Sequence, residues 1–204
     1  GNYNSLFGES AGHAITTGDN NTAIGYNSLD AGTDAHDNTA IGFASLGSAV
    51  SVGYAVAIGN ESMNNGNVTS DADGAVGIGY KALYALTSGA RNTAVGYQSL
   101  MTENTGSYHT SLGYQALKVV DAPNGHNTGL GHKAGVAISS GSSNTVVGSA
   151  VAESLSTGTN NTIIGAGADV SASGSTNLTV IGASAVGQAD NSVTLGNTDV
   201  TKIY

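Results

Sequence analysis

The 204-residue chain has no cysteine, no tryptophan, one proline and only five lysine and arginine residues. Without cysteine it can form neither disulfide bonds nor thiolate metal sites. No run of about 18 apolar residues is present to span a membrane. The basic residues are scattered and the formal net charge is −9, whereas a nucleic-acid backbone requires clustered positive charge. The sequence therefore argues against disulfide-rich folds, membrane insertion by this segment and nucleic-acid binding.

Glycine, by contrast, is abundant and periodic. Among the 31 glycines, one set recurs every 17 residues, except for intervals of 20, 18 and 14 residues before Gly79, Gly131 and Gly196. These repeat glycines are Gly8, Gly25, Gly42, Gly59, Gly79, Gly96, Gly113, Gly131, Gly148, Gly165, Gly182 and Gly196. A fixed period of this size indicates one small unit stacked on itself, because a single unit cannot bury its own apolar face. We expect one elongated repeat domain over residues 1–204, as a piece of a longer fibre protein.

The positions before each repeat glycine form uniform columns. In Thr22-Ala23-Ile24-Gly25, for example, a β-branched residue, a small residue and a large apolar residue precede the glycine. Side chains alternate along a strand, so the Thr and Ile columns share one face and the small column lies on the other. We predict that the Thr and Ile columns point inward, and that the flat, small-residue face lies against another backbone.

A second apolar segment follows each repeat glycine. Ser28 and Leu29 represent it in the second repeat, and a polar turn then leads into the next unit. We predict two short strands and two turns per repeat, with parallel strands about 4.8 Å apart and no amphipathic helix. Asparagine recurs four residues before the glycine, as at Asn21 and Asn38, and is predicted to form a hydrogen-bonded ladder rather than a ligand-binding row. His109 and His126 are expected to replace asparagine in this ladder.

The repeat resembles those of known fibrous surface proteins. Asn-Ser-Val-Thr-Leu-Gly-Asn at residues 191–197 closely resembles the repeat of trimeric autotransporter adhesin heads (the YadA-like family), and the final 14-residue interval matches that family's period. The Asn-Thr-Ala-Ile-Gly-Tyr form at residues 21–26 is similar to the 17-residue variant of phage tail fibres. The resemblance implies an all-β, left-handed parallel β-roll (solenoid) of twelve rungs that assembles as a homotrimer. Thin coils need such reinforcement, so we expect the small-residue face to abut another chain.

Three segments imitate enzyme motifs. Gly8-Glu9-Ser10-Ala11-Gly12 matches the G-x-S-x-G nucleophile elbow, but that motif requires a strand followed by a helix. Residues 77–82 and 129–134 resemble a dinucleotide-binding turn, but neither segment begins a helix. Their glycines keep the register of the repeat, so we expect no catalytic residues.

Two groups of residues are candidate receptor contacts. The first is the aromatic column just after the repeat glycine, which either packs against a neighbouring chain or stacks on sugars; it consists of Tyr26, Phe43, Tyr80, Tyr97, Tyr114 and His132, with Asn60 interrupting. The second is the longest insertion, before Gly79, because variable loops on a regular scaffold carry specificity; its members are Asn65, Asn67, Asp71 and Asp73. This insertion and a second acidic cluster (Asp30, Asp34, His36 and Asp37) could hold Ca²⁺, but they lack the EF-hand glutamate. We expect exposed turns and no cofactor.

These observations favour a non-enzymatic trimeric fibre or adhesin-head module on a bacterial cell surface or a phage virion. Its partners would be two further copies of the chain and a cell-surface glycan or protein receptor, bound with avidity by three identical faces. A structural shaft or spacer without a ligand is the first alternative. An ice- or mineral-surface binder is the second, and the predicted inward direction of the Thr column argues against it.

Overall fold

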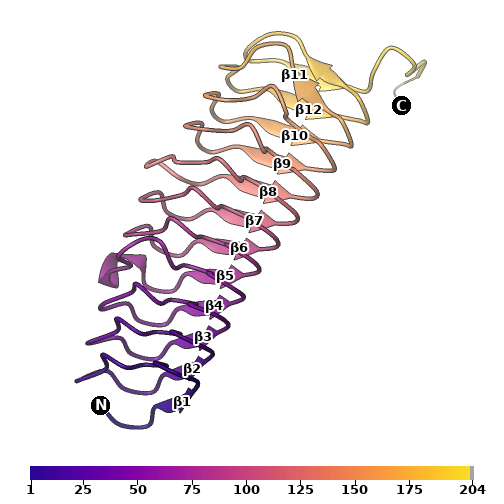
Figure 1. Ribbon diagram of the computed structural model, residues 1–204. Helices are drawn as coiled ribbons and strands as arrows, with labels where there is room; N and C mark the ends of the chain where they lie inside the picture. Colours follow the sequence, from indigo (N-terminus) through magenta and orange to yellow (C-terminus); the bar gives the residue numbers. More distant parts are fainter. Residues whose placement is uncertain (203–204) are drawn as a thin grey trace.

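The computed structural model describes residues 1–202, which wind into a parallel β-solenoid (Figure 1). One three-residue strand per turn builds a single 12-stranded sheet, and two short strands form a second sheet. The elements are β1 (Ser5–Phe7), β2 (Thr22–Ile24), β3 (Thr39–Ile41), β4 (Val56–Ile58), η1 (Ser70–Ala72), β5 (Val76–Ile78), β6 (Thr93–Val95), β7 (Thr110–Leu112), β8 (Thr128–Leu130), β9 (Thr145–Val147), β10 (Thr162–Ile164), β11 (Asp169–Val170), β12 (Thr179–Ile181), β13 (Val186–Gly187) and β14 (Val193–Leu195). The predicted parallel repeat architecture is confirmed.

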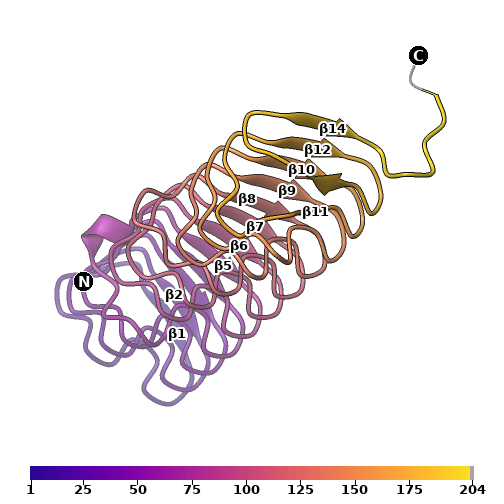
Figure 2. The same cartoon turned by 90° about the horizontal axis from the view of Figure 1, so that it is seen from above.

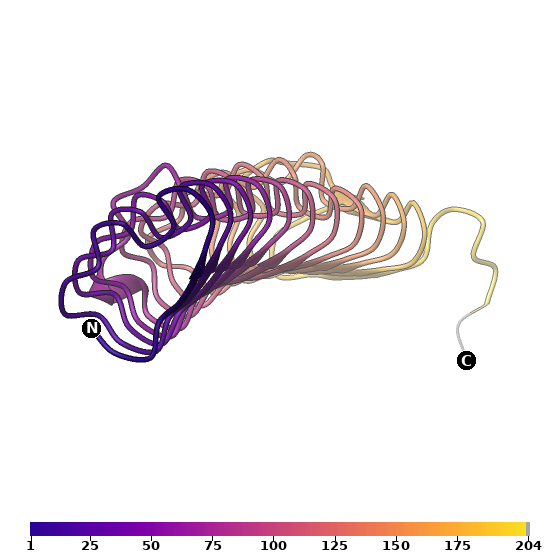
Figure 3. The same cartoon turned by 60° about the horizontal axis from the view of Figure 1, so that its bottom comes forward.

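Neighbouring strands of the large sheet are parallel and keep the register of the repeat. Thr22 pairs with Thr39 and Ile24 with Ile41, so chemically equivalent side chains lie above one another along the sheet. The 20-residue interval does not disturb this register, because Val56 still pairs with Val76. Its extra residues protrude from the stack as the short helix η1 (Figure 1). Figure 2 shows the resulting ribbon of strands, and Figure 3 shows the turns as a stack of narrow loops.

The small-residue column, and not the Ile column, faces the interior. Ala23, Ala40 and Ala94 are fully buried, whereas Thr22 and Ile24 beside them reach the surface. The predicted inward direction of the Thr and Ile columns is therefore wrong. The reason is volume: the Leu and Met side chains of the second segment already fill the narrow coil. At Gly129 an added Cβ would come within 2.6 Å of Leu117 Cγ, so there is room only for small residues opposite the leucines.

The second apolar segment is a turn in most rungs rather than the predicted strand. Ser28 N–H bonds back to the Gly25 carbonyl at 3.3 Å, and Asn27 and Leu29 have φ of 54° and 49°. Such left-handed backbone costs a non-glycine residue about 1–3 kcal/mol. Complete burial of Leu29 contributes about 1.5–3 kcal/mol, which offsets that cost. Within residues 1–202, only β11 and β13 form a second strand pair, near the C-terminal end of the stack.

The repeat glycine is required by the backbone of its own chain. Gly42 has φ of +130°, and a Cβ there would lie 2.6 Å from the carbonyl oxygen of Gly59 in the next rung. The close backbone approach predicted at the glycine column is present, but the approaching backbone is the next turn of the same chain. The expectation that the small-residue face abuts another chain is wrong, because that face lies inside the coil of a single chain.

The predicted asparagine ladder is confirmed. Asn144 Nδ2 donates to Asn127 Oδ1 at 3.1 Å and to the Gly158 carbonyl at 2.8 Å. Asn144 Oδ1 in turn accepts the backbone N–H and the side-chain Nδ2 of Asn161, at 3.0 and 2.9 Å. These side chains are buried, so the ladder satisfies turn groups that water cannot reach.

Candidate binding surfaces

The aromatic column after the repeat glycine forms a stacked ladder along the C-terminal ends of the strands of the large sheet. Neighbouring ring centroids are 5.1–5.6 Å apart for the pairs Tyr26–Phe43, Tyr80–Tyr97, Tyr97–Tyr114 and Tyr114–His132. Tyr97 and Tyr114 are thus covered on both ring faces, and a sugar could lie flat on either ring only if the ladder opened. Their exposed edges and hydroxyl groups can still contact a partner. Receptor contact by Tyr26, Phe43, Tyr80, Tyr97 and Tyr114 stays a prediction.

The side chain of Lys81 contacts this aromatic ladder at Tyr80. Lys81 Nζ lies 3.1 Å from Glu61 Oε2 in the preceding rung, and 5.5 and 4.6 Å from the ring centroids of Tyr80 and Tyr84. Hydrogen bonding to the Glu61 carboxylate raises the pKa of Lys81 above its ordinary value of 10.5. The ammonium group is therefore held between a carboxylate and two aromatic rings.

A second stack, which sequence analysis did not identify, lies at the opposite end of each strand. We call it the corner column: the residue five before each repeat glycine, namely Tyr3, Asn20, Asp37, Tyr54, Gly74, Arg91, Tyr108, His126, Ser143, Asn160, Asn177 and Asn191. Every non-glycine member has left-handed backbone, with φ between 54° and 63°. Alignment on the glycine could have revealed the column, but its varied side chains hide the shared conformation.

Several members of the corner column contact the next rung. Asn20 Nδ2 donates to Asp37 Oδ1 at 3.1 Å, and an Arg91 guanidinium N–H donates to the Tyr108 hydroxyl at 3.1 Å. The rings of Tyr108 and His126 stack at 5.1 Å. His126 therefore belongs to this column, and its predicted place in the asparagine ladder is wrong.

The column is interrupted at Gly74, where a hollow opens. This hollow has a volume of about 540 Å³, and its lining residues are Tyr54, Ser70, Asp71, Asp73, Gly74, Ala90 and Arg91. The insertion supplies both carboxylates, so two of the predicted receptor contacts, Asp71 and Asp73, come together here. Asn65 and Asn67 do not line it, nor does any ring of the aromatic ladder. Tyr54 and Arg91 were not predicted from the sequence, and they lie two rungs apart, on either side of Gly74.

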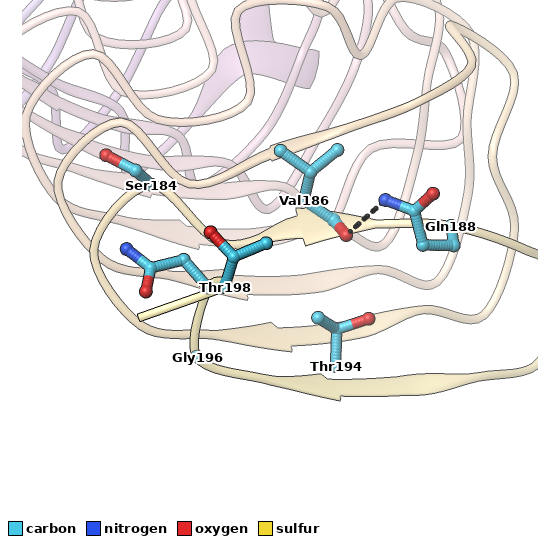
Figure 4. A pocket seen from close by; sticks show the side chains of 7 residues that line it. Ser184, Val186, Gln188, Thr194, Gly196 and Thr198 are labelled. Carbon is cyan, nitrogen blue, oxygen red and sulfur yellow. Dashed lines mark hydrogen bonds between the residues drawn. The ribbon is translucent and has the colours of Figure 1, made fainter. Parts of the chain in front are cut away.

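A second hollow, of about 570 Å³, lies at the C-terminal end of the stack (Figure 4). Thr194 of β14 and Val186 of β13 line it, together with Gln188, whose side-chain amide donates to the Val186 carbonyl at 2.9 Å. Thr194 belongs to the small-residue column, and it is partly exposed because no rung within residues 1–202 covers β14. The lining contains no ionisable side chain, so this hollow is the open end of the coil interior.

One ionisable pair is completely buried. His109 replaces asparagine in the ladder, as predicted. Its backbone N–H donates to Asn92 Oδ1 at 2.8 Å, and its ring Nδ1 accepts the backbone N–H of Asn127 at 3.2 Å. The ring proton is thus assigned to Nε2, which lies 3.0 Å from Glu103 Oε2 without the alignment of a hydrogen bond. The Glu103 carboxylate accepts the N–H groups of Gly106 and Ala122, at 2.5 and 3.2 Å. This pair closes a turn of the coil.

The other motifs singled out in the sequence lie in ordinary positions of the repeat. Ser10 follows β1 in a turn with φ of 56°, and its carbonyl accepts the His13 N–H. Gly77 lies within β5 and Gly129 within β8, with no helix after either strand. Asp30 and Asp37 lie 3.7 and 3.3 Å from the histidines at 13 and 36. Across residues 1–202, no three His, Asp or Glu side chains gather into a metal-binding group.

Comparisons with protein-family models, curated protein sequences and solved structures yield no match to this chain. Within the described part of the chain, no helix has the length and apolarity to cross a membrane.

Proposed function

We propose that the chain is a module of a homotrimeric, non-enzymatic extracellular fibre that presents an attachment surface. The observation that supports this proposal is the outer face of the 12-stranded sheet. Its apolar column is continuous from β1 to β14, and its most exposed members retain 37–77% of their accessible surface: Phe7, Ile24, Leu112, Leu130, Ile164, Ile181 and Leu195. An apolar surface of this extent marks an interaction site in soluble proteins.

Copies of the same chain are the partner that best fits this outer face. The Thr and Ile columns carry no charged residue, although the chain has a net charge of −9. Contact through these columns therefore buries apolar surface without bringing the acidic turns together. In a rotationally symmetric assembly, the same residue of each copy lies at the same height along the fibre axis. Because the repeat is in register, each rung then contacts the equivalent rungs of the other copies along the whole fibre. The left-handed, trimeric roll implied by the resemblance is the arrangement that we propose.

Light scattering of the purified protein tests the assembly. A trimer has three times the mass of the 20.0 kDa chain. Leu112→Lys and Leu130→Lys place charges on neighbouring strands of the outer face, where both leucines are exposed in a single chain. We expect these variants to fold but to dissociate, while Ser140→Lys, in an exposed turn, stays trimeric. A folded, monomeric wild-type protein would contradict the trimer.

Attachment is tested separately, by binding of the assembled protein to bacterial cells and to a glycan array. Binding to either supports the attachment function, and three linked faces would amplify weak contacts. If a well-formed trimer binds neither bacterial cells nor any arrayed glycan, the structural-spacer function would be favoured.

One observation also favours the ice- or mineral-surface alternative. The Thr column faces outward, so the argument made against this function from sequence does not hold. Thr93, Thr110 and Thr128 pair in register, which gives hydroxyl and methyl groups at a regular spacing of about 4.8 Å. This function needs the same face as the trimer, so the two proposals compete. Thermal hysteresis in a solution of folded monomer would support the alternative.

A further inference from the structure

We infer that the interruption of the corner column at Gly74 is a binding subsite for the ring of a neutral sugar. The inference rests on the proposed attachment function, because it specifies a ligand class for the attachment surface. A ligand ring would occupy the place of the side chain that Gly74 lacks, between Tyr54 and Arg91.

The spacing of the column leaves room for one ring. Tyr54 and Arg91 belong to rungs on either side of Gly74, so they are separated by two strand spacings, or about 9.6 Å. In the same column, Tyr108 and His126 stack with their centroids 5.1 Å apart. A Cβ added at Gly74 would meet only Arg91 Cγ, at 3.8 Å, which is ordinary contact. The gap at Gly74 thus has the width of one side chain of the corner column, and it is open to solvent.

The two sides of the gap offer flat groups. Tyr54 is 62% exposed, and its ring makes a T-shaped contact with the His36 ring, with the two ring centroids 5.2 Å apart. Arg91 lies on the other side, with its guanidinium 5.8 Å from the Tyr108 ring centroid and bonded to the Tyr108 hydroxyl group. An aromatic ring provides a surface for the apolar face of a sugar. Arg91 has five N–H donors, so it can donate to sugar hydroxyl groups as well as to Tyr108.

Acidic acceptors complete the hollow. Asp73 Oδ1 accepts the Gly53 N–H at 2.7 Å, which holds the carboxylate in place. Its second oxygen makes no hydrogen bond within residues 1–202, so it can accept one from a ligand hydroxyl. Asp71, in η1, lines the same hollow. Hydrogen-bonding groups at the rim of an apolar platform orient a small ligand.

The charges of the hollow select a neutral ligand. Two carboxylates face one guanidinium, so an anionic sugar would meet net negative charge. A cationic ring would be attracted by the two carboxylates, but the nearby guanidinium of Arg91 would oppose that attraction. A neutral pyranose meets neither penalty, and it can use both donors and acceptors through its hydroxyl groups.

Saturation-transfer NMR with methyl glucoside, methyl galactoside and methyl mannoside tests the subsite on the intact protein. We expect at least one of the three to bind in the millimolar range. Gly74→Tyr fills the gap with a residue that the column accepts at Tyr54 and Tyr108 with left-handed backbone. We expect Gly74→Tyr and Tyr54→Ala each to weaken binding about tenfold or more. Asn160→Tyr makes the same change elsewhere in the column and should leave binding unaltered.

Each other result would overturn the subsite. No binding of the three glycosides by folded wild-type protein would refute it, and so would binding that Gly74→Tyr leaves intact. Preference for a sialylated or amino sugar would refute the charge argument. Failure of the subsite is distinguishable from failure of the proposed function, because a trimer that still binds cells or arrayed glycans without this hollow retains the function through another surface.

Discussion

Truncation of one member of the asparagine ladder tests how the coil is held together. In the variant Asn144→Ala, the buried N–H of Asn161 and the buried carbonyl of Gly158 each lose the partner that Asn144 supplies. Asn161 Nδ2 keeps a second partner, the Ser175 carbonyl, and Asn127 Oδ1 still accepts the backbone N–H of residue 144. Two orphaned buried groups at about 1–3 kcal/mol each give a local destabilisation of about 2–6 kcal/mol.

Hydrogen exchange is the suitable assay, because stacked repeats open locally rather than in one all-or-none step. The N–H groups of Thr145 and Thr162 donate to the carbonyls of Asn161 and Leu178, and they report the rung that carries the substitution and the rung that follows it. A loss of 2 kcal/mol corresponds to exchange about 30-fold faster at these amides. Ser140→Ala, in an exposed turn, should change exchange little. If Asn144→Ala alters exchange no more than Ser140→Ala does, the ladder does not stabilise the coil and the reasoning fails.

Two further predictions concern the glycine column and the lysine in the aromatic ladder. Gly42→Ala should destabilise the solenoid by more than about 4 kcal/mol, because the added Cβ would collide with the Gly59 carbonyl. Gly174→Ala is the control, because a Cβ at Gly174 makes only ordinary contacts. Equal midpoints of urea unfolding for the two variants would contradict the explanation. Because the Lys81 pKa is raised in the folded protein, its ion pair with Glu61 stabilises fully below the ordinary pKa of 10.5 and less as the pH rises through the folded-state value. Glu61→Gln should therefore flatten the loss of thermal stability above pH 10.5, and an unchanged alkaline profile would show that the pair contributes nothing.

The candidate surfaces were only partly predictable from the sequence. The stacking of Tyr80 on Tyr97 follows from the repeat alone, since both rings occupy one column. The hollow at Gly74 does not, because Tyr54 and Arg91 are 37 residues apart and the insertion between them separates their repeats. Asp71 and Asp73 were recognisable as loop carboxylates, but their neighbours follow only from the way the turns stack.

The period, the in-register strands and the asparagine ladder all follow from the order of residues along the chain. Each of these features places identical residues above one another, so one-dimensional spacing is enough to specify it. Which side of each strand lies inside the coil depends instead on three-dimensional packing. Alternation with a period of two defines two faces but does not distinguish inner from outer. The distinction comes from volume: the leucines at 29, 46, 83, 100 and 117 are buried and fill the narrow coil, and only alanine, glycine or serine fits opposite most of them. The isoleucines that directly precede the repeat glycines are therefore left on the outer face, where another chain can cover them.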